Sequence, residues 1–171
     1  MHVIHPFDPV VDDQSRILIL GSFPSVKSRE TGFYYGHPQN RFWKMLGRIF
    51  DEGIPVTIAD KKDFLKRHHL ALWDVLASCE ITGSSDASIK KAVPNDLASL
   101  LNHSQIKTIL INGNTAYTLF VRHIEVDALI QVIRLPSTSA ANAVMSLDQL
   151  TQRWSIALSE ETDTTDSHKS I

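Results

Sequence analysis

The stretch "RILILGS", residues 16–22, contains four consecutive large apolar side chains and ends in a small polar turn. A continuous apolar run of this length is typical of a strand that is buried on both faces, as in a parallel sheet covered by helices. Three later stretches have the same character: "HLALWDVL" at 69–76, "IKTILINGN" at 106–114 and "IQVIRLPS" at 130–137. The sequence therefore predicts four parallel strands.

Helical patterns separate these predicted strands. One face of a helix is shared by Phe42, Met45, Leu46 and Ile49, and similar periodicity occurs at 96–103, 115–124 and 146–160. The last begins with Ser146 and Gln149 at the spacing of a capping box. Alternating strands and helices predict an α/β protein, a three-layer α/β/α sandwich around a four-stranded parallel sheet. We expect one domain over residues 1–161 and a disordered polar tail over 162–171.

Composition places the chain among ordinary globular proteins, with 171 residues, 43% hydrophobic and 21% charged. The apolar runs are far shorter than the roughly 20 residues that span a bilayer. Asp8, Asp12 and Asp13 occupy the region where a signal peptide needs basic and then apolar residues. The lone Cys79 agrees with a reducing compartment and is expected to be a small buried side chain. We therefore expect a cytoplasmic protein without a membrane segment. A monomer is also expected.

The charge is unevenly distributed. The formal net charge is −2, yet residues 16–48 contain six basic residues and one acidic residue. Residues 151–171 contain two basic and four acidic residues. A local basic surface can bind phosphates even when the whole protein is not basic, although a solvated charged face would give the same pattern.

The unusual residues gather where the predicted strands end. Ligands of an open parallel sheet bind outside the carboxyl ends of its strands. Those ends carry "GSFPS" at 21–25, "WDVL" at 73–76, "NGN" at 112–114 and "PSTSAAN" at 136–142. The first of these matches neither a dinucleotide fingerprint nor a phosphate loop nor a nucleophile elbow. Chemistry is therefore predicted at this edge of the sheet, with no nucleotide-binding motif.

Three features of this edge are candidates for function, and each also has an ordinary structural explanation. The hydroxyl groups of "PSTSAAN" suit phosphate oxygens but also suit a turn. Asn40 stands before a helix, where asparagine is a favoured N-cap. Asp74 ends an apolar strand, and a carboxylate there must be solvated, paired or hydrogen-bonded. The histidines, the cysteine and the carboxylates show no metal-ligand spacing, so neither a metal nor another cofactor is predicted and the zinc deaminases are disfavoured.

Taken in order, "ILGSFPSVKS", "YYGHPQNRFW", "LWDVLASCEITGSSDASIK", "INGNTA" and "LPSTSAANA" resemble the hypoxanthine-DNA glycosylase family, the DNA-deoxyinosine glycosylases of the uracil-DNA glycosylase superfamily. The resemblance runs from about residue 16 to residue 158. It implies the α/β/α fold already predicted from periodicity. It also implies that the protein excises a deaminated base from DNA.

The resemblance also implies roles for individual residues. In this family the catalytic asparagine is displaced from the first-strand loop, and the matching residue is Asn40. The first motif would place Gly21, Ser22 and Phe23 around the base, and Asp74 falls where related enzymes read the base edge. The last motif would hold the DNA backbone or minor groove with three residues: Ser137, Ser139 and Asn142.

Glycosylase chemistry assigns further roles. The target nucleotide must be extruded into a pocket that stacks on its base, and the rings of Phe23, Tyr34, Tyr35, Phe42 and Trp43 suit that need. Bond cleavage builds oxocarbenium character on the sugar and negative charge on the departing base.

Polar side chains can meet those charges. We expect His37 to donate to the base anion, Asp74 or Asn112 to hydrogen-bond the base, and Arg41 to face phosphate. A neutral amide cannot accept a proton, so Asn40 is expected to orient water through its carbonyl. With no lysine evidently placed as a nucleophile, the sequence predicts a monofunctional enzyme that leaves an abasic site.

Other functions stay open. The same motifs allow a uracil-DNA glycosylase or a catalytically silent DNA-binding module. A small-molecule hydrolase using Ser22 or Ser139 is disfavoured because no His–Asp pair is evident beside either. Residues 136–145 carry no basic loop, and Met145 is their only bulky side chain, so the group that fills the gap left by a flipped base is not identified.

Overall fold

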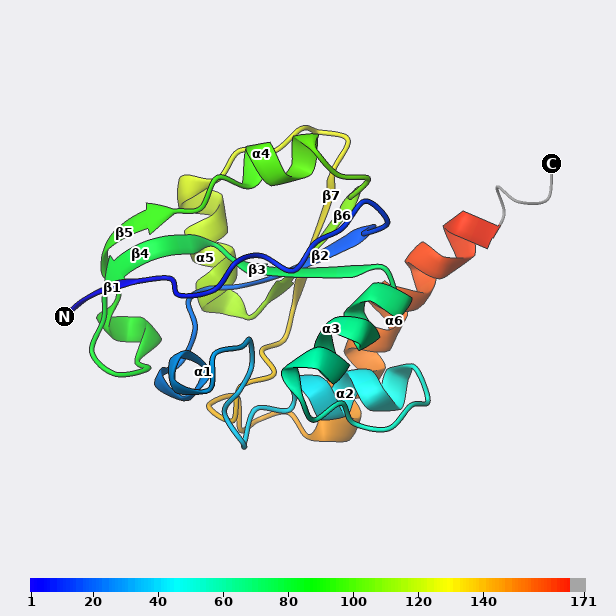
Figure 1. Cartoon of the computed structure of the whole chain (residues 1–171), viewed down its shortest axis with the longest axis horizontal. Coiled ribbons are helices and arrows are strands. Elements are labelled where there is room, and N and C mark those ends of the chain that lie inside the picture. Colours follow the sequence, from blue (N-terminus) through cyan, green and yellow to red (C-terminus); the bar gives the residue numbers. More distant parts are fainter. Residues whose placement is uncertain (167–171) are drawn as a thin grey trace.

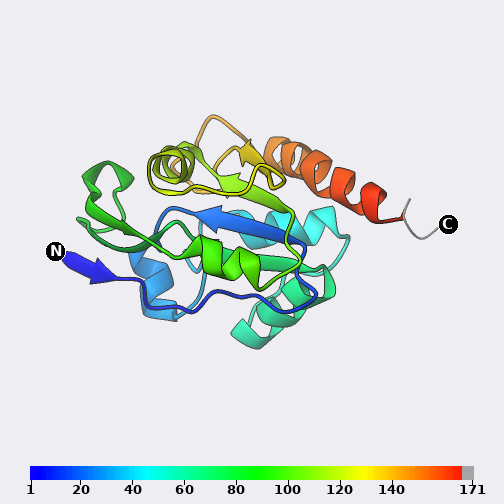
Figure 2. The ribbon, with the colours of Figure 1, turned by 90° about the horizontal axis from the view of Figure 1, so that it is seen from above.

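The computed structural model describes residues 1–166. Its central sheet has four parallel strands in the order β3-β2-β6-β7 (Figures 1 and 2). Their bounds are β2 (Ile17–Gly21), β3 (Leu70–Asp74), β6 (Thr108–Asn112) and β7 (Gln131–Leu135). The four predicted strands and their parallel arrangement are confirmed.

Two apolar cores lie on opposite faces of this sheet. Ile17 and Ile19 of β2 belong to one core, and Leu18 and Leu20 belong to the other, because successive side chains of a strand point to opposite faces. The first core is covered by α2 (Phe42–Ile49), α3 (Ile58–Arg67) and α6 (Leu147–Asp166). The second is covered by α4 (Leu97–Asn102) and α5 (Asn114–His123). The three-layer α/β/α sandwich is therefore confirmed (Figure 1).

A second, antiparallel sheet was not predicted. It consists of β1 (His2–Ile4), β4 (Leu76–Glu80) and β5 (Lys90–Pro94) in the order β1-β4-β5. The stretch 69–76, predicted as one strand, ends at Asp74, and β4 begins two residues later. Apolar residues on both sides of Asp74 hid this change of sheet. The hairpin of β4 and β5 also contains a short 3₁₀ turn, η1 (Asp86–Ser88).

Two helices were also missed. The first, α1 (Val26–Thr31), follows β2, and its capping residue Ser25 accepts from the Ser28 N–H. The second, α3, begins with a capping box in which Thr57 and Asp60 each accept from the other's backbone N–H. Thr57 and Asp60 have the spacing that identifies such a start, so this signal was available in the sequence.

The C-terminal helix begins as expected. Ser146 and Gln149 form the predicted capping box, because each side chain accepts a hydrogen bond from the other residue's N–H. The helix α6 continues to Asp166, five residues into the segment expected to be a disordered tail, and residues 167–171 lie outside the described part. Cys79 is buried, as expected, and burial raises the pKa of its thiol. Within residues 1–166, no helix has the length and apolar character needed to cross a membrane.

Candidate functional site

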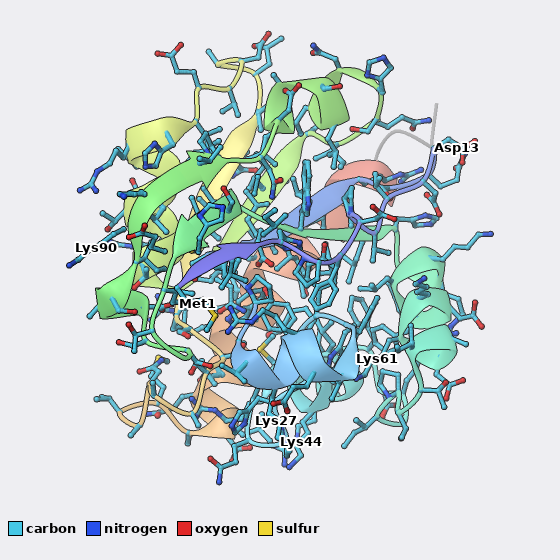
Figure 3. The ribbon with its side chains drawn as sticks, turned by 60° about the vertical axis from the view of Figure 1, so that its left-hand side comes forward. Met1, Asp13, Lys27, Lys44, Lys61 and Lys90 are labelled. Atoms are coloured by element: carbon cyan, nitrogen blue, oxygen red, sulfur yellow. The ribbon has the colours of Figure 1, made fainter. Side chains whose placement is uncertain are left out.

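A cavity of about 330 Å³ lies at the carboxyl edge of the parallel sheet. Figure 3 turns this side of the molecule forward, with α1 in light blue. The cavity brings together most of the residues predicted from the sequence: Gly21, Ser22, Phe23, Tyr35, His37, Asn40, Asp74, Asn112, Ser137 and Ser139. Arg41 and Asn142 do not line it. Its volume falls within the range of about 300 to 1,000 Å³ usual for small-ligand sites.

Gly21 allows two polar groups to converge on the floor of this cavity. The register of β2 and β3 pairs Gly21 with Asp74. A Cβ at position 21 would lie 2.5 Å from Asp74 Oδ1 and 3.2 Å from the Tyr35 hydroxyl. Any side chain there would collide with the carboxylate. The bare backbone of Gly21 therefore leaves an acceptor and a phenol side by side.

The Tyr35 hydroxyl is a buried donor. Its ring stacks on Phe42, with centroids 4.0 Å apart, and its backbone adopts the left-handed conformation with φ 54°. The hydroxyl makes no hydrogen bond of normal geometry to any described residue. Burial, and then the charge of Asp74, raise the pKa of Tyr35, while a weaker interaction with Asn112 lowers it. The phenol is therefore protonated at neutral pH and can donate into the cavity.

A chain of hydrogen bonds crosses the cavity wall from Asn112 to Asn40 through Thr138, a fully buried residue that sequence reasoning missed. The Thr138 N–H donates to Asn112 Oδ1, and Asn112 Nδ2 donates to Thr138 Oγ1, both at 3.0 Å. The Thr138 hydroxyl in turn donates to Asn40 Oδ1 at 2.9 Å. Thr138 lies within the quoted "PSTSAAN" stretch, but nothing in the stretch marked its hydroxyl as different from its neighbours'.

Both lone pairs of the Asn40 carbonyl are occupied, because Oδ1 also accepts from the Phe42 N–H at 3.0 Å. Asn40 therefore caps the first helical residue of α2, although it stands one position before the N-cap itself, Arg41. The expectation that this carbonyl orients water is not supported by the geometry. The amide NH₂ group is the part of Asn40 that is left for the cavity.

Arg41 does not face phosphate with its guanidinium. That group donates to backbone carbonyls of the segment 138–145, at 2.8 Å to Ser139, at 3.0 Å to Asn142 and also to Met145. Its Nε makes a longer contact of 3.4 Å with the Thr138 carbonyl. These contacts correct the expected role, because the donors that would bind phosphate instead hold the start of α2 against this segment.

Local hydrogen bonds shape the same segment. Ser137 Oγ accepts from the Ser139 N–H, Ser139 Oγ accepts from the Ala141 N–H, and Asn142 Nδ2 donates to the Ser137 carbonyl. Both hydroxyl groups still have their own hydrogen to donate. Met145, the bulky residue noted in the sequence, is partly buried against the core, whereas Val144 is 91% exposed.

Two further polar groups border the cavity. His37 Nδ1 accepts from the Gln39 N–H at 3.1 Å, which leaves the proton on Nε2 as a donor. The Ser22 hydroxyl donates to Asp86 Oδ1 at 3.4 Å, and burial raises the pKa of the Asp86 carboxyl. Asp86 was not among the predicted residues. Within residues 1–166 no group of three or more side chains has the arrangement of a metal site.

The N-terminal segment supplies a residue that sequence reasoning missed entirely. His5 Nε2 lies 2.7 Å from Asp74 Oδ2. The Asn95 side chain donates to the backbone carbonyl of the same aspartate at 2.9 Å. A lone histidine 69 residues before Asp74 gave no signal of this pairing.

Comparisons with known proteins show the family and the fold to which this chain is similar. The model of the family described as the uracil DNA glycosylase superfamily matches residues 9–157. A protein of Methanosarcina acetivorans named hypoxanthine DNA glycosylase is 34% identical over 140 residues, which cover 80% of this chain and 86% of the relative. A protein of the same name from Methanosarcina barkeri is 38% identical over 109 residues, covering 63% and 69%. The solution structure of a candidate uracil DNA glycosylase from Methanosarcina acetivorans superposes with a TM-score of 0.75 at 30% identity, covering 92% of this chain and 97% of its own.

Proposed function

The chain belongs to the uracil DNA glycosylase superfamily, and from that premise we propose that it removes hypoxanthine from deoxyinosine in DNA. As a DNA glycosylase it hydrolyses the N-glycosidic bond of a deaminated base. Two relatives are named hypoxanthine DNA glycosylases, which supports this choice of base. The monomeric state and cytoplasmic location expected from the sequence stay predictions.

The observation that carries the proposal is the pair of polar groups above Gly21. Hypoxanthine presents a ring N–H at N1 and a carbonyl at C6. Asp74 Oδ1 can accept from such an N–H, and the protonated Tyr35 hydroxyl can donate to such a carbonyl. Adenine presents a lone pair at N1 and an amino group at C6, so it mismatches both. The pair therefore suits the deaminated base and disfavours its parent.

Access to this pair requires the nucleotide to leave the DNA stack. Phe23 and Tyr35 line the cavity and supply aromatic surface for the base. Residues 137–141 line the same cavity, where Ser137 and Ser139 can donate to phosphate oxygens. Val144 follows them and is 91% exposed, so we assign this apolar side chain to the gap in the stack.

Cleavage of the bond leaves negative charge on the base, and donors aimed at it lower the barrier. We assign that task to the Asn40 NH₂ group and to His37 Nε2–H, since both residues line the cavity. One such donor is typically worth about 3 to 4 kcal/mol of transition-state stabilisation. Among the described residues that line the cavity there is no lysine, which supports hydrolysis without a Schiff base.

An excision assay on a panel of lesions tests the proposal. Duplex oligonucleotides carrying deoxyinosine, deoxyuridine, deoxyxanthosine or unmodified bases are incubated with the protein and then treated with alkali. We expect strand breaks at deoxyinosine that appear only after alkali, because a monofunctional enzyme leaves an intact abasic strand. Preference for deoxyuridine would instead indicate a uracil-DNA glycosylase, whose base offers a similar N–H and carbonyl.

Two other outcomes would contradict the proposal. Salt-sensitive binding to the lesion duplexes without any abasic product would indicate a silent DNA-binding module. Breaks without alkali would contradict the monofunctional mechanism. The Asn40→Asp variant, purified in parallel, controls for contaminating glycosylases.

A further inference from the structure

His5 and Asp74 form a buried pair behind the candidate base site. Their side chains are only 3% and 5% exposed, and His5 Nε2 lies 2.7 Å from Asp74 Oδ2. His5 follows β1 in the segment that runs from Met1 to Asp13, which passes between α1 and the hairpin of β4 and β5 (Figure 3). A carboxylate so deeply buried requires hydrogen-bond partners, and this histidine supplies one.

The surroundings of His5 fix which of its ring nitrogens carries the proton. The Phe7 N–H donates to His5 Nδ1 at 3.2 Å, so Nδ1 is an acceptor and the proton of the neutral ring resides on Nε2. Edge-on contacts with Phe7 and Phe23, at centroid distances of 5.4 and 5.9 Å, hold the plane of the ring. His5 therefore donates to Asp74 Oδ2.

Because Oδ2 is held by His5, the other oxygen of Asp74 is directed over Gly21 into the cavity. We propose that His5 is a positioning residue that fixes Asp74 as a hydrogen-bond acceptor toward the base, so that the site selects bases with a ring N–H and rejects bases with a lone pair at that position. This inference rests on the proposed function, because it concerns the base that the same cavity reads.

The substitution Asp74→Asn tests the role of His5, because an amide has one acceptor and one donor and His5 determines which of them faces the base. In Asp74→Asn, the Nε2–H of His5 attracts the amide carbonyl and thereby turns the NH₂ group toward the cavity. The site then offers a donor where hypoxanthine also offers one. In His5→Gln/Asp74→Asn, the side-chain carbonyl of the glutamine can accept a hydrogen bond from the asparagine NH₂ group. The asparagine carbonyl is then free to face the base as an acceptor.

The experiment compares excision of deoxyinosine with excision of deoxynebularine, whose purine has a lone pair at N1 and no group at C6. The ratio of kcat/KM for the two substrates is measured in one preparation, so it does not depend on the fraction folded. For Asp74→Asn we expect this ratio to fall on the order of 100-fold, as expected when a site's hydrogen-bonding group opposes the substrate's. The His5→Gln variant keeps a donor toward Asp74 and should stay within about threefold of wild type.

The double variant His5→Gln/Asp74→Asn gives the decisive result. We expect it to regain about tenfold of the lost ratio relative to Asp74→Asn alone, since one hydrogen bond is reversed. A residue that only packs would leave the double variant no better than the single one, and that result would overturn the inference. His5→Phe keeps a ring without a donor, so an unchanged ratio in that variant would overturn it as well. If the wild-type protein does not excise hypoxanthine, the proposed function fails instead.

Discussion

The apolar core and the carboxyl edge of the parallel sheet are two regions that are buried to a similar degree but differ in chemistry. Beneath the sheet, Phe42, Met45 and Trp154 are completely buried in an apolar core. At the carboxyl edge, Asp74 and Thr138 are almost as inaccessible, yet both are polar and hydrogen-bonded. Apolar burial contributes stability in proportion to area, about 25 cal/mol per Å². A satisfied polar group contributes little net stability but fixes the direction of its donors and acceptors. Substitutions in the two regions should therefore separate stability from activity.

The largest expected effect lies in the apolar core. Trp154→Ala removes a fully buried ring that makes a T-shaped contact with Phe42 and donates its indole N–H to the Pro136 carbonyl at 3.0 Å. We expect the free energy of unfolding to fall by about 4 kcal/mol, as for other large-to-small core substitutions. Urea denaturation measures this loss. Deoxyinosine excision per folded molecule should change little, and Trp154→Phe should lose less stability. A variant that stays stable but loses activity would break the distinction between the two regions.

The next effect concerns chemistry at constant stability. Asn40→Asp keeps an oxygen that accepts from the Phe42 N–H and from the Thr138 hydroxyl, but it lacks the amide NH₂ group. We expect excision of deoxyinosine to fall by about 100- to 1,000-fold, the effect of removing one donor to a developing anion. Single-turnover kinetics measures this change, and thermal melting should show little loss of stability.

The matched variant Asn40→Ala removes both functions of the side chain. It should lose excision to a similar extent and, in addition, about 1 kcal/mol of stability, because the acceptor for the Phe42 N–H is lost. If Asn40→Asp retained near-wild-type excision, the assignment of the NH₂ group to the departing base would be wrong.

A smaller effect on both properties is expected at Thr138, which links the two asparagines. Thr138→Val keeps the shape of the side chain but leaves Asn112 Nδ2 and one lone pair of Asn40 Oδ1 without their partner. We expect a loss of about 1 to 3 kcal/mol in the free energy of unfolding. Excision should fall about tenfold, since Asn40 loses one of the two bonds that orient it. Thr138→Ser retains the hydroxyl and should restore most of both. If Thr138→Ser lost as much as Thr138→Val, the methyl group would matter as much as the hydroxyl, and the role assigned to the hydroxyl bridge would be wrong.

The fold could be predicted from local patterns because those patterns report burial directly. The apolar run of residues 17–20 indicates side chains that are buried in the core, and so does the helical face of Phe42, Met45 and Leu46. The edge strand β1 and the hairpin of β4 and β5 are partly exposed, so their sequences carry a weaker signal. The apolar residues that flank Asp74 within 69–76 also concealed the end of β3 at that residue.

The position of the site could be predicted from the sequence, but the direction of its hydrogen bonds could not. The carboxyl ends of parallel strands located Asp74 and Asn112 from topology alone. The partner of Asn40 is 98 residues away and the partner of Asp74 is 69 residues away. No local pattern reports which lone pair or N–H such distant groups occupy. The sequence therefore indicated most of the side chains that line the cavity, while the partners His5 and Thr138 and the direction of each donor required the structure.

The smallest predicted effect tests whether Arg41 acts on DNA directly or through the segment that it holds. A residue that neutralises a phosphate adds about 0.9 to the slope of log affinity against log salt concentration. The Arg41 guanidinium donates to backbone carbonyls and therefore does not reach phosphate. Arg41→Gln should weaken binding to a deoxyinosine duplex several-fold, because the hydrogen bonds that hold the segment 138–145 are lost. The slope against salt concentration should stay the same. Fluorescence anisotropy across a salt series measures both quantities. Lys44→Gln provides the comparison, because Lys44 is an exposed cation of the same basic stretch. If Arg41→Gln lowered the slope by about one unit, its charge would be reaching phosphate, and the role assigned from the carbonyl contacts would be wrong.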